Sequence, residues 1–453
     1  MDTTVAAPLV PEAALKTTAP KKVINGWAMY DWANSAYNLV ITSTIFPAYY
    51  DAITTLKDDG GKVISHDVHF LGRTFESASL YNYAIAFAYL VIALLSPILS
   101  SIADFRGNKK RFMQFFCYLG GIACCTLYAF TGDTLTLGIV CCILAAIGYC
   151  GSLVFYNSYL PEIAAEKDQD RVSARGFSFG YIGSVLLQII CFVFVLKPGL
   201  LGLPDEGAAS RLSFLLVGLW WMGFAQIAFR VLPKGQPNGD GSRRNIFTSG
   251  FAELRKVARQ AGNMPVLKRY LASFFFYSMG VQTVMLAATL FGSQVLQLPT
   301  SKLIACILII QLVAIAGAYL MAKLSERFGN FQVLLFVVLL WIGICIAAYF
   351  TTTETQFYII ATVVGLVMGG IQSLSRSTYA KIMPPTHDTA SFFSFYDVTE
   401  KIAIVIGMLS FGLVQEATGN MRNSVLALVV FFILGALGLM LTLSKQRQVR
   451  AGL

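Results

Sequence analysis

The sequence predicts an all-α membrane protein with twelve transmembrane helices arranged as two pseudo-symmetric six-helix bundles. Apolar residues make up 56% of the chain and charged residues 13%, whereas soluble domains contain about 25% charged residues. The 453 residues contain twelve apolar stretches, each close to the roughly 20 residues that a helix needs to cross a bilayer. Basic residues gather in alternate gaps between these stretches, which is typical of short loops that stay in the cytoplasm.

The predicted spans form two sets of six. They lie near residues 27–50, 79–103, 112–131, 135–160, 176–196 and 212–232, and near 270–296, 301–323, 332–351, 356–380, 391–416 and 422–444. The chain therefore divides into a cytoplasmic disordered tail (1–24), a first bundle (25–232), a cytoplasmic linker (233–268), a second bundle (269–444) and a cytoplasmic tail (445–453).

The distribution of basic residues predicts the orientation. With the N-terminus inside, 25 of the 34 Lys and Arg residues lie in inner segments, and only seven lie in outer loops. Both termini are therefore expected in the cytoplasm. The same distribution explains the net charge of +10 without a nucleic-acid partner.

The linker contains one candidate helix. Apolar Phe247, Phe251, Leu254 and Ala258 recur at helical spacing, opposite basic Arg255, Lys256 and Arg259. Such a pattern favours an interfacial helix that lies against anionic headgroups. The alternative is a basic linker without a role at the membrane.

The two sets of spans repeat one another. Asp104 and Glu326 follow the second and eighth spans, Tyr159 and Tyr379 close the fourth and tenth, and the Phe-Ser-Phe triplets at 177 and 393 open the fifth and eleventh. The offsets are 222, 220 and 216 residues. Two parallel six-helix halves are a transporter arrangement, with the solute site between them near the midplane.

Several spans contain polar side chains that would be costly in lipid. A charge at the centre of a span costs about 2.5–3.5 kcal/mol, so each charge needs a partner, a cavity or an interface. In the first span Asp31, Asn34, Ser35, Asn38 and Thr42 share one face. We interpret this stripe as the lining of a cavity; its alternative is a polar contact between helices.

Three other spans have similar faces. The tenth span has Gln372 and Arg376 among small residues, the fourth has Tyr156, and the seventh has Gln282. These side chains are candidates for a solute pathway. Arg376 lies near the inner end of its span, so extension of its side chain to the headgroups is an alternative role.

The eleventh span begins with Asp397, Glu400 and Lys401 on one face. Within the membrane, Asp31, Asp397 and Glu400 would then face two bases, Arg376 and Lys401. One carboxylate would remain unpaired, and burial favours its protonated form. A proton-coupling site has this property; the alternative is a salt-bridge network that holds the halves together.

The loop after the second span resembles the signature of the major facilitator superfamily. Residues 100–111 read Ser-Ser-Ile-Ala-Asp-Phe-Arg-Gly-Asn-Lys-Lys-Arg, with Ser100 where the superfamily pattern has Gly. The resemblance implies that Asp104 caps the eleventh helix and that basic residues form a cytoplasmic gate. The gate motif comprises Asp104, Arg106, Gly107, Lys109 and Lys110, with Glu326 and Gly329 in the second half.

Further motifs resemble the vacuole effluxer family, which comprises autophagy-related amino-acid effluxers and their bacterial relatives. They are Tyr30-Asp-Trp-Ala-Asn-Ser-Ala-Tyr37 followed by Phe46-Pro47, Tyr156-Asn-Ser-Tyr-Leu-Pro161, Gly180-Tyr-Ile-Gly183, Gln372-Ser-Leu-Ser-Arg-Ser377 and Phe393-Ser-Phe-Tyr-Asp-Val398. The resemblance implies efflux of small solutes, and fungal members are associated with neutral amino acids. The compact length looks bacterial, which implies the inner membrane.

The leading hypothesis is therefore an alternating-access carrier of a small solute that works as a monomer, with protons as a second partner. The sequence contains no HExxH motif and no evident nucleophile paired with a base, so it does not indicate an enzyme. It also contains no GxxxxGK[ST] loop, so it does not indicate a nucleotide-driven pump. The sequence indicates no cofactor and no metal site. The alternative is a transport-inactive receptor or scaffold with the same fold.

Overall fold

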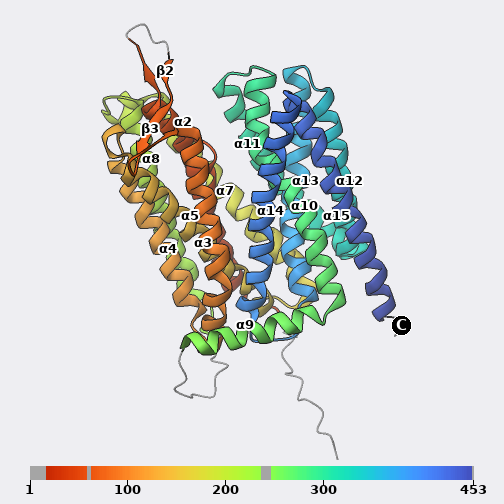
Figure 1. Ribbon diagram of the computed structural model, residues 1–453. Coiled ribbons are helices and arrows are strands. Elements are labelled where there is room, and N and C mark those ends of the chain that lie inside the picture. Colours follow the sequence, from red (N-terminus) through yellow and green to blue (C-terminus); the bar gives the residue numbers. More distant parts are fainter. Residues whose placement is uncertain (1–16, 59–62, 236–245, 451–453) are drawn as a thin grey trace, which may run out of the picture.

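The computed structural model describes residues 17–58, 63–235 and 246–450. Two groups of long helices stand side by side, and one shorter helix crosses beneath both (Figure 1). The first group contains α1 (Lys21–Ala36), the π-helical η1 (Tyr37–Thr42), α2 (Ile45–Thr54), α3 (Ser77–Arg106), α4 (Lys109–Thr126), α5 (Leu135–Ser158), α7 (Gln169–Leu196) and α8 (Glu206–Val231). The second contains α10 (Pro265–Leu290), the π-helical η6 (Phe291–Val295), α11 (Thr300–Phe328), α12 (Asn330–Phe350), α13 (Glu354–Ile382), α14 (Thr389–Thr418) and α15 (Met421–Arg450).

Short elements connect the long helices. Two antiparallel hairpins, absent from the sequence-based prediction, lie between α2 and α3 at the end of the molecule opposite α9 (Figure 1). They pair β1 (Leu56–Lys57) with β2 (Val63–Ser65) and β3 (Asp67–Phe70) with β4 (Arg73–Glu76). The other connections are η2 (Leu127–Ala129), η3 (Gly132–Thr134), α6 (Leu160–Ile163), η4 (Glu166–Asp168), η5 (Pro198–Leu201) and α9 (Ile246–Gly262).

Ten helices in the described part of the chain are long and apolar enough to cross a membrane. The predicted first span is interrupted, because α1 ends at Ala36 and continues through η1 into α2. The predicted eleventh span is α14, which contains Asp397, Glu400 and Lys401. Both segments lie where the sequence predicts spans, so the all-α membrane fold is confirmed and the structure is consistent with twelve crossings.

The two halves pack on each other in a reciprocal pattern. Helix α7 of the first half packs on α11 and α13 of the second, while α14 of the second half packs on α3 and α5 of the first. The π-helical η1 and η6 both follow the first long helix of their half. This correspondence agrees with the repeat seen in the sequence and with a pseudo-two-fold axis between the halves.

Helix packing within each half depends on small residues. A Cβ atom on Gly369 of α13 would collide with the carbonyl group of Ala314 in α11. Backbones can approach this closely only where a side chain is absent, which is how helices associate in lipid. The largest fully buried side chains include Trp27, Trp221 and Trp341, so each half has its own aromatic core.

The element ends differ by a few residues from the predicted domain limits. Helix α1 begins at Lys21 rather than after residue 24, and α15 continues to Arg450, through most of the predicted tail at 445–453. Hydropathy detects only the apolar part of a helix, and polar turns at its ends are invisible to it. Residues 1–16, 236–245 and 451–453 lie outside the described residues, so parts of both tails and of the linker do too.

Both ends of the described chain lie on the α9 side of the molecule. Thr18 donates a hydrogen bond to Asp168 of η4 at 2.5 Å, and the Ala19 N–H donates to the Ile163 carbonyl of α6 at 2.8 Å. The C-terminal end of α15 extends to the same side (Figure 1). An even number of crossings produces this arrangement.

Candidate solute pathway and gate

Arg376 of α13 reaches across to the first half, where it pairs with Asp31 of α1. The distance from the Arg376 Nη1 to the Asp31 Oδ2 is 3.4 Å, and both side chains are buried. The Tyr156 hydroxyl donates to the same Asp31 oxygen at 2.8 Å. We call Asp31 and Arg376 the cross-half ion pair. Its buried position excludes the alternative in which Arg376 extends to the headgroups.

The remaining donors of Arg376 are satisfied by residues that the sequence analysis did not assign to the solute pathway. Its Nε donates to the Ser173 hydroxyl at 3.0 Å and its Nη2 to the Ser173 carbonyl at 2.9 Å. Its Nη1 also donates to the Asn157 side chain at 3.1 Å. A planar guanidinium can make all these bonds at once, whereas a lysine ammonium cannot.

Aromatic rings surround the same guanidinium. Its central carbon lies 4.2 Å from the ring centre of Phe177, 4.8 Å from Trp27 and 5.4 Å from Tyr156. Trp27 and Tyr156 stack with their ring centres 4.5 Å apart. Contacts of this kind stabilise a desolvated cation. All three rings come from the first half, so Arg376 is held entirely by the opposite half.

Two more hydrogen bonds connect the halves near this pair. The Tyr181 hydroxyl of α7 donates to the Gln372 side chain of α13 at 2.7 Å. The Ser173 hydroxyl donates to the Ser373 carbonyl at 2.7 Å. Gln372 and Arg376, which the sequence places on one face of the tenth span, therefore both face the first half.

The rest of the first-span stripe is only partly in contact with protein. Asn34 is fully buried, and its amide nitrogen has no partner among the described residues. Asn38, two turns from Asp31, is exposed. The face that the sequence predicts as a cavity lining therefore has the buried ion pair of Asp31 at one end and the exposed amide of Asn38 further along.

Asp397, Glu400 and Lys401 form a second charged group, which we call the α14 cluster. The Lys401 Nζ lies 3.4 Å from the Asp397 Oδ1 and 3.2 Å from the Glu400 Oε2. Gln282 of α10 donates to the Glu400 Oε1 at 3.0 Å. Four of the predicted pathway residues therefore lie together in this cluster: Gln282, Asp397, Glu400 and Lys401. None of them contacts Asp31 or Arg376 of the cross-half ion pair through the hydrogen bonds and ion pairs of the described residues.

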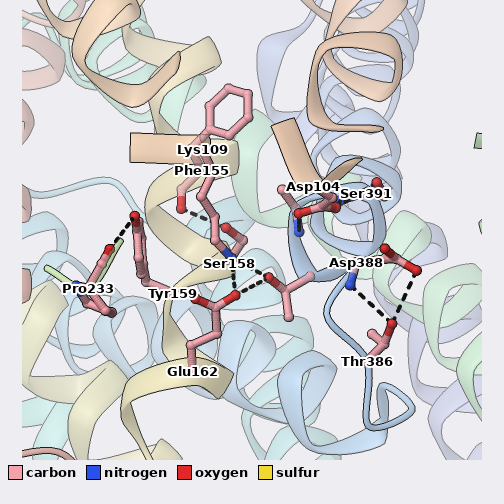
Figure 2. Close-up of polar contacts among 12 residues, drawn as sticks. Asp104, Lys109, Phe155, Ser158, Tyr159, Glu162, Pro233, Thr386, Asp388 and Ser391 are labelled. Carbon is pink, nitrogen blue, oxygen red and sulfur yellow. Dashed lines mark hydrogen bonds and ion pairs between the residues drawn. The ribbon is translucent and has the colours of Figure 1, made fainter. Parts of the chain in front are cut away.

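The signature loop meets the start of α14. The Asp104 carboxylate accepts hydrogen bonds from the Ser391 N–H and hydroxyl, both at 2.7 Å, and from the Ala390 N–H at 3.3 Å. Asp104 thus occupies the capping position of α14 from the other half of the molecule (Figure 2). An acid at this end of a helix also interacts favourably with the helix dipole.

Lys109 adds a second contact to the same helix end. It pairs with Glu162 (Figure 2). It also donates to the Thr389 hydroxyl at 2.8 Å, and Thr389 donates to Glu162 at 2.7 Å. Lys110 instead donates to the Phe229 carbonyl of its own half at 2.9 Å. Arg106 is exposed. Of the three basic gate candidates, Lys109 alone bridges the halves in the described part of the chain.

Gly107 ends α3 in the left-handed conformation, with φ 63°. An L side chain is strained there, and the turn allows Asn108 to donate its N–H to the Ala103 carbonyl at 3.0 Å. Gly329 ends α11 in the second half with φ 88°. Both glycines of the predicted gate motif are therefore required by backbone geometry.

The second half has a corresponding contact, but Glu326 does not make it. Glu326 is exposed, and Asp170 at the start of α7 is the buried acid. Asp170 accepts from Ser325 at 2.8 Å, from Asn330 at 2.7 Å and from Lys381 at 2.5 Å. One residue is 100° of helix, so the neighbour of Glu326 faces the first half while Glu326 itself faces away.

A cavity of about 750 Å³ lies between these contacts. Its lining combines Asp104, Lys109 and Glu162 from the first half with Lys381 and His387 from the second. The described residues contain no group of three or more His, Cys, Asp or Glu side chains that could hold a metal ion. The arrangement suits the closing and opening of a passage between two halves.

Known structures share this fold. The proton:xylose symporter XylE has a TM-score of 0.67 at 13% identity, with 92% of this chain and 94% of that chain covered. The E. coli fucose:proton symporter FucP has a TM-score of 0.64 at 16% identity, with 93% and 97% covered. The fold is that of major facilitator superfamily transporters, a class of transporters and not of enzymes.

Sequence relatives give the family. The sequence model of the family "Vacuole effluxer Atg22 like" matches residues 19–452, so this chain belongs to that family. It is 33% identical over 417 residues to the uncharacterized MFS-type transporter YxiO of Bacillus subtilis (strain 168), with 91% of this chain and 92% of that protein covered. It is 26% identical over 465 residues to autophagy-related protein 22 of Eremothecium gossypii, with 92% and 90% covered. Both predicted resemblances are confirmed.

Proposed function

We propose that this chain is a secondary transporter that moves small neutral amino acids out of the cell in exchange for protons. One observation carries the proposal: the contacts between the halves gather at the α9 end. Arg376, Gln372, Lys381 and the start of α14 all hydrogen-bond to the first half there. An alternating-access carrier closed on one side requires such contacts, and it must break them to open that side.

The α9 end is the cytoplasmic side in this proposal. The described Lys and Arg residues of the inner segments lie there, as the orientation rule for short loops requires. Both termini are then cytoplasmic, and the membrane is a bacterial inner membrane. The described state is closed toward the cytoplasm, with Asp104, Lys109 and Asp170 as gate residues.

The solute pathway runs between the halves past Asn34, Asn38, Gln282 and Gln372. These side chains offer amide donors and acceptors on faces that meet other helices or water. A zwitterion needs both kinds of group. Membership in a family of vacuole effluxers supports efflux as the direction.

Flux measured on purified protein tests the proposal. Proteoliposomes of the wild type should release labelled leucine faster than protein-free liposomes, and a proton gradient should change the final distribution of leucine. A panel of amino acids, sugars and nucleosides, screened first for thermal stabilisation, covers other solutes. Binding of a solute without any flux would favour the receptor or scaffold instead.

The carrier acts as a monomer in this proposal, because each chain contains both halves and the gate residues that join them. Single-particle mass measurement in nanodiscs, followed by flux at one chain per vesicle, tests this point. Loss of flux at one chain per vesicle would contradict it.

A further inference from the structure

The α14 cluster carries a charge that no contact among the described residues balances. Asp397 and Glu400 are acids, and Lys401 is a single base between them. With all three ionised, the cluster has a formal charge of −1. The side chains of Asp397 and Lys401 are 4% and 6% exposed, so this charge lies away from water. An uncompensated buried charge is costly, and proteins commonly remove it by protonation.

The hydrogen bonds identify which carboxylate oxygen lacks a partner. Glu400 uses both oxygens, one for Lys401 and one for Gln282. Asp397 uses only its Oδ1, for Lys401. Its Oδ2 is buried and has no hydrogen-bond partner among the described residues. A carboxylate oxygen in this position is much less costly when it carries a proton.

Among the described residues, no second Lys or Arg side chain forms an ion pair with the cluster. From α3 the facing titratable group is Tyr89, from α5 they are Tyr149 and Cys150, and from α10 it is Tyr277. On α14 itself the nearby phenol is Tyr396. Helix α15 has no charged residue between Arg422 and Lys445. These phenols and this thiol are neutral near pH 7, so they do not balance the cluster.

Asp31 is a different kind of acid, although the sequence ranks it with Asp397. Its Oδ2 faces Arg376 and accepts a hydrogen bond from Tyr156. The cross-half ion pair is therefore balanced, and its role is to hold the halves together. Of the three membrane carboxylates, Asp397 is the one with a buried oxygen that lacks a hydrogen-bond partner among the described residues.

We propose that Asp397 binds and releases the proton that the transporter exchanges for its solute, a conclusion that rests on the proposed function. The step is COO⁻ plus H⁺ giving COOH at Oδ2, with Lys401 then balanced by Glu400 alone. The occupant is a proton rather than the solute's ammonium group, because Oδ2 has almost no accessible surface. A proton needs no space there. Glu400, whose side chain is 23% exposed, connects the cluster to water.

The charge of the cluster then controls the movement of the halves. Lys401 lies 5.9 Å from the ring centre of Tyr89 in the opposite half, so the cluster faces the surface along which the halves move. A charge of −1 is tolerated where water enters and is costly when the halves close around it. Protonation makes the cluster neutral and permits this closure in the half-cycle that returns without solute.

Transport at different pH values tests the inference. In leucine-loaded vesicles a one-unit pH difference should let the wild type reach about a tenfold concentration ratio, as one exchanged proton allows. Asp397→Asn should still exchange labelled for unlabelled leucine but reach a ratio of about one. Asp397→Glu should restore part of the coupling, and Asp133→Asn, an exposed acid in a loop, should behave as the wild type.

Infrared spectroscopy tests the protonation without any solute. The wild type should show a protonated-carboxyl C=O band that grows between about pH 8 and about pH 5 and is absent in Asp397→Asn. If leucine flux is absent in the wild type but this band is present, the proposed solute is wrong and the inference stands. The inference is overturned if the band persists in Asp397→Asn or if that variant remains coupled. Coupling to Na⁺ at constant pH would also overturn it.

Discussion

Arg376 joins the two halves through a buried ion pair and several hydrogen bonds. It extends from α13 into a pocket formed by Asp31, Asn157, Ser173 and aromatic rings of the first half. Because both charges are buried, removal of one leaves the other without compensation. Such a loss costs about 3–5 kcal/mol, whereas replacement of both charges is far less costly.

This asymmetry gives a prediction for a double-mutant cycle. Arg376→Gln and Asp31→Asn should each lower the melting temperature of the protein in detergent, and the double variant should melt above at least one of them. Differential scanning fluorimetry measures all four proteins. Arg171→Gln, which removes an exposed charge, is the matched control. Additive losses in the double variant would show that the two charges are not paired.

The sequence shows which charged residues would be costly to place in lipid, but it does not show their partners. Asp31, Arg376, Asp397 and Lys401 stand out because charge is rare in apolar spans. That Arg376 pairs with a residue 345 positions away depends on how the halves meet, and one sequence does not contain that information. Ser173, Asn157, Trp27 and Phe177 were not predicted as contacts of Arg376, although Asn157 and Phe177 belong to motifs in the sequence. Small polar residues are common where membrane helices meet, so their presence alone does not identify a contact.

At the scale of elements, the N-terminus of α14 is held by a cap from another helix. Asp104 supplies the acceptor, and Ser391 supplies both the N–H and the hydroxyl donor. A helix cap contributes about 1 kcal/mol. Because this cap joins the two halves, its loss should favour the state that is open on the α9 side, and not only fray the helix.

Asp104→Ala should therefore increase opening on the α9 side by about fivefold, the ratio that corresponds to about 1 kcal/mol. The measurement is the rate of maleimide labelling of Ala380→Cys, a buried residue that lines the cavity, in a variant without the nine native cysteines. Lys167→Cys is exposed and serves as the control. Equal labelling of Ala380→Cys with and without Asp104 would contradict the capping role.

Helix α9 was predicted from its spacing, and the structure shows which face is covered. Val257 is fully buried and the helix packs on α3, whereas Phe251 is 54% exposed. Lys256 pairs with Asp388 just before α14 at 3.3 Å. The predicted apolar face therefore remains partly free, as an interfacial helix requires. Val257 was not among the predicted apolar positions, because the helical spacing alone does not show which residues pack against other helices.

If α9 lies in the headgroup region, Phe251→Trp should add tryptophan fluorescence that brominated lipids quench. The comparison is the wild type in the same liposomes, because its five tryptophans give the background. Arg259→Trp, on the polar face, should be quenched less. Equal quenching at the two positions would indicate that α9 is not oriented on the membrane.

At the scale of the whole molecule, the repeat predicted two related halves, and the structure contains them. Offsets near 220 residues matched the spans of one half with those of the other. The repeat matched Glu326 with Asp104 and so predicted Glu326 as a gate residue. In the structure, Asp170 and Ser325 make the corresponding contact between the halves instead. The interrupted first span and the hairpins also escaped prediction, since hydropathy reports neither π-helical turns nor short strands.

The basic residues predict that both termini are cytoplasmic. A green fluorescent protein fused after residue 453 should fluoresce in bacterial cells, and alkaline phosphatase fused there should be inactive. Alkaline phosphatase inserted in the turn between β3 and β4, beside the exposed Leu71, should be active. The reverse pattern of activities would invert the proposed orientation and place the gate residues outside.

The central claim is that the halves rock between a state closed at the α9 end and a state open there. Distances between spin-label pairs test it most directly in nanodiscs. Exposed Lys167 and Arg327 report the α9 end, and exposed Leu201 and Thr352 report the opposite end. We predict two populations whose distances change in opposite directions, with Asp104→Ala lengthening the Lys167–Arg327 distance. One rigid population, unchanged by Asp104→Ala and by pH, would contradict alternating access in this protein.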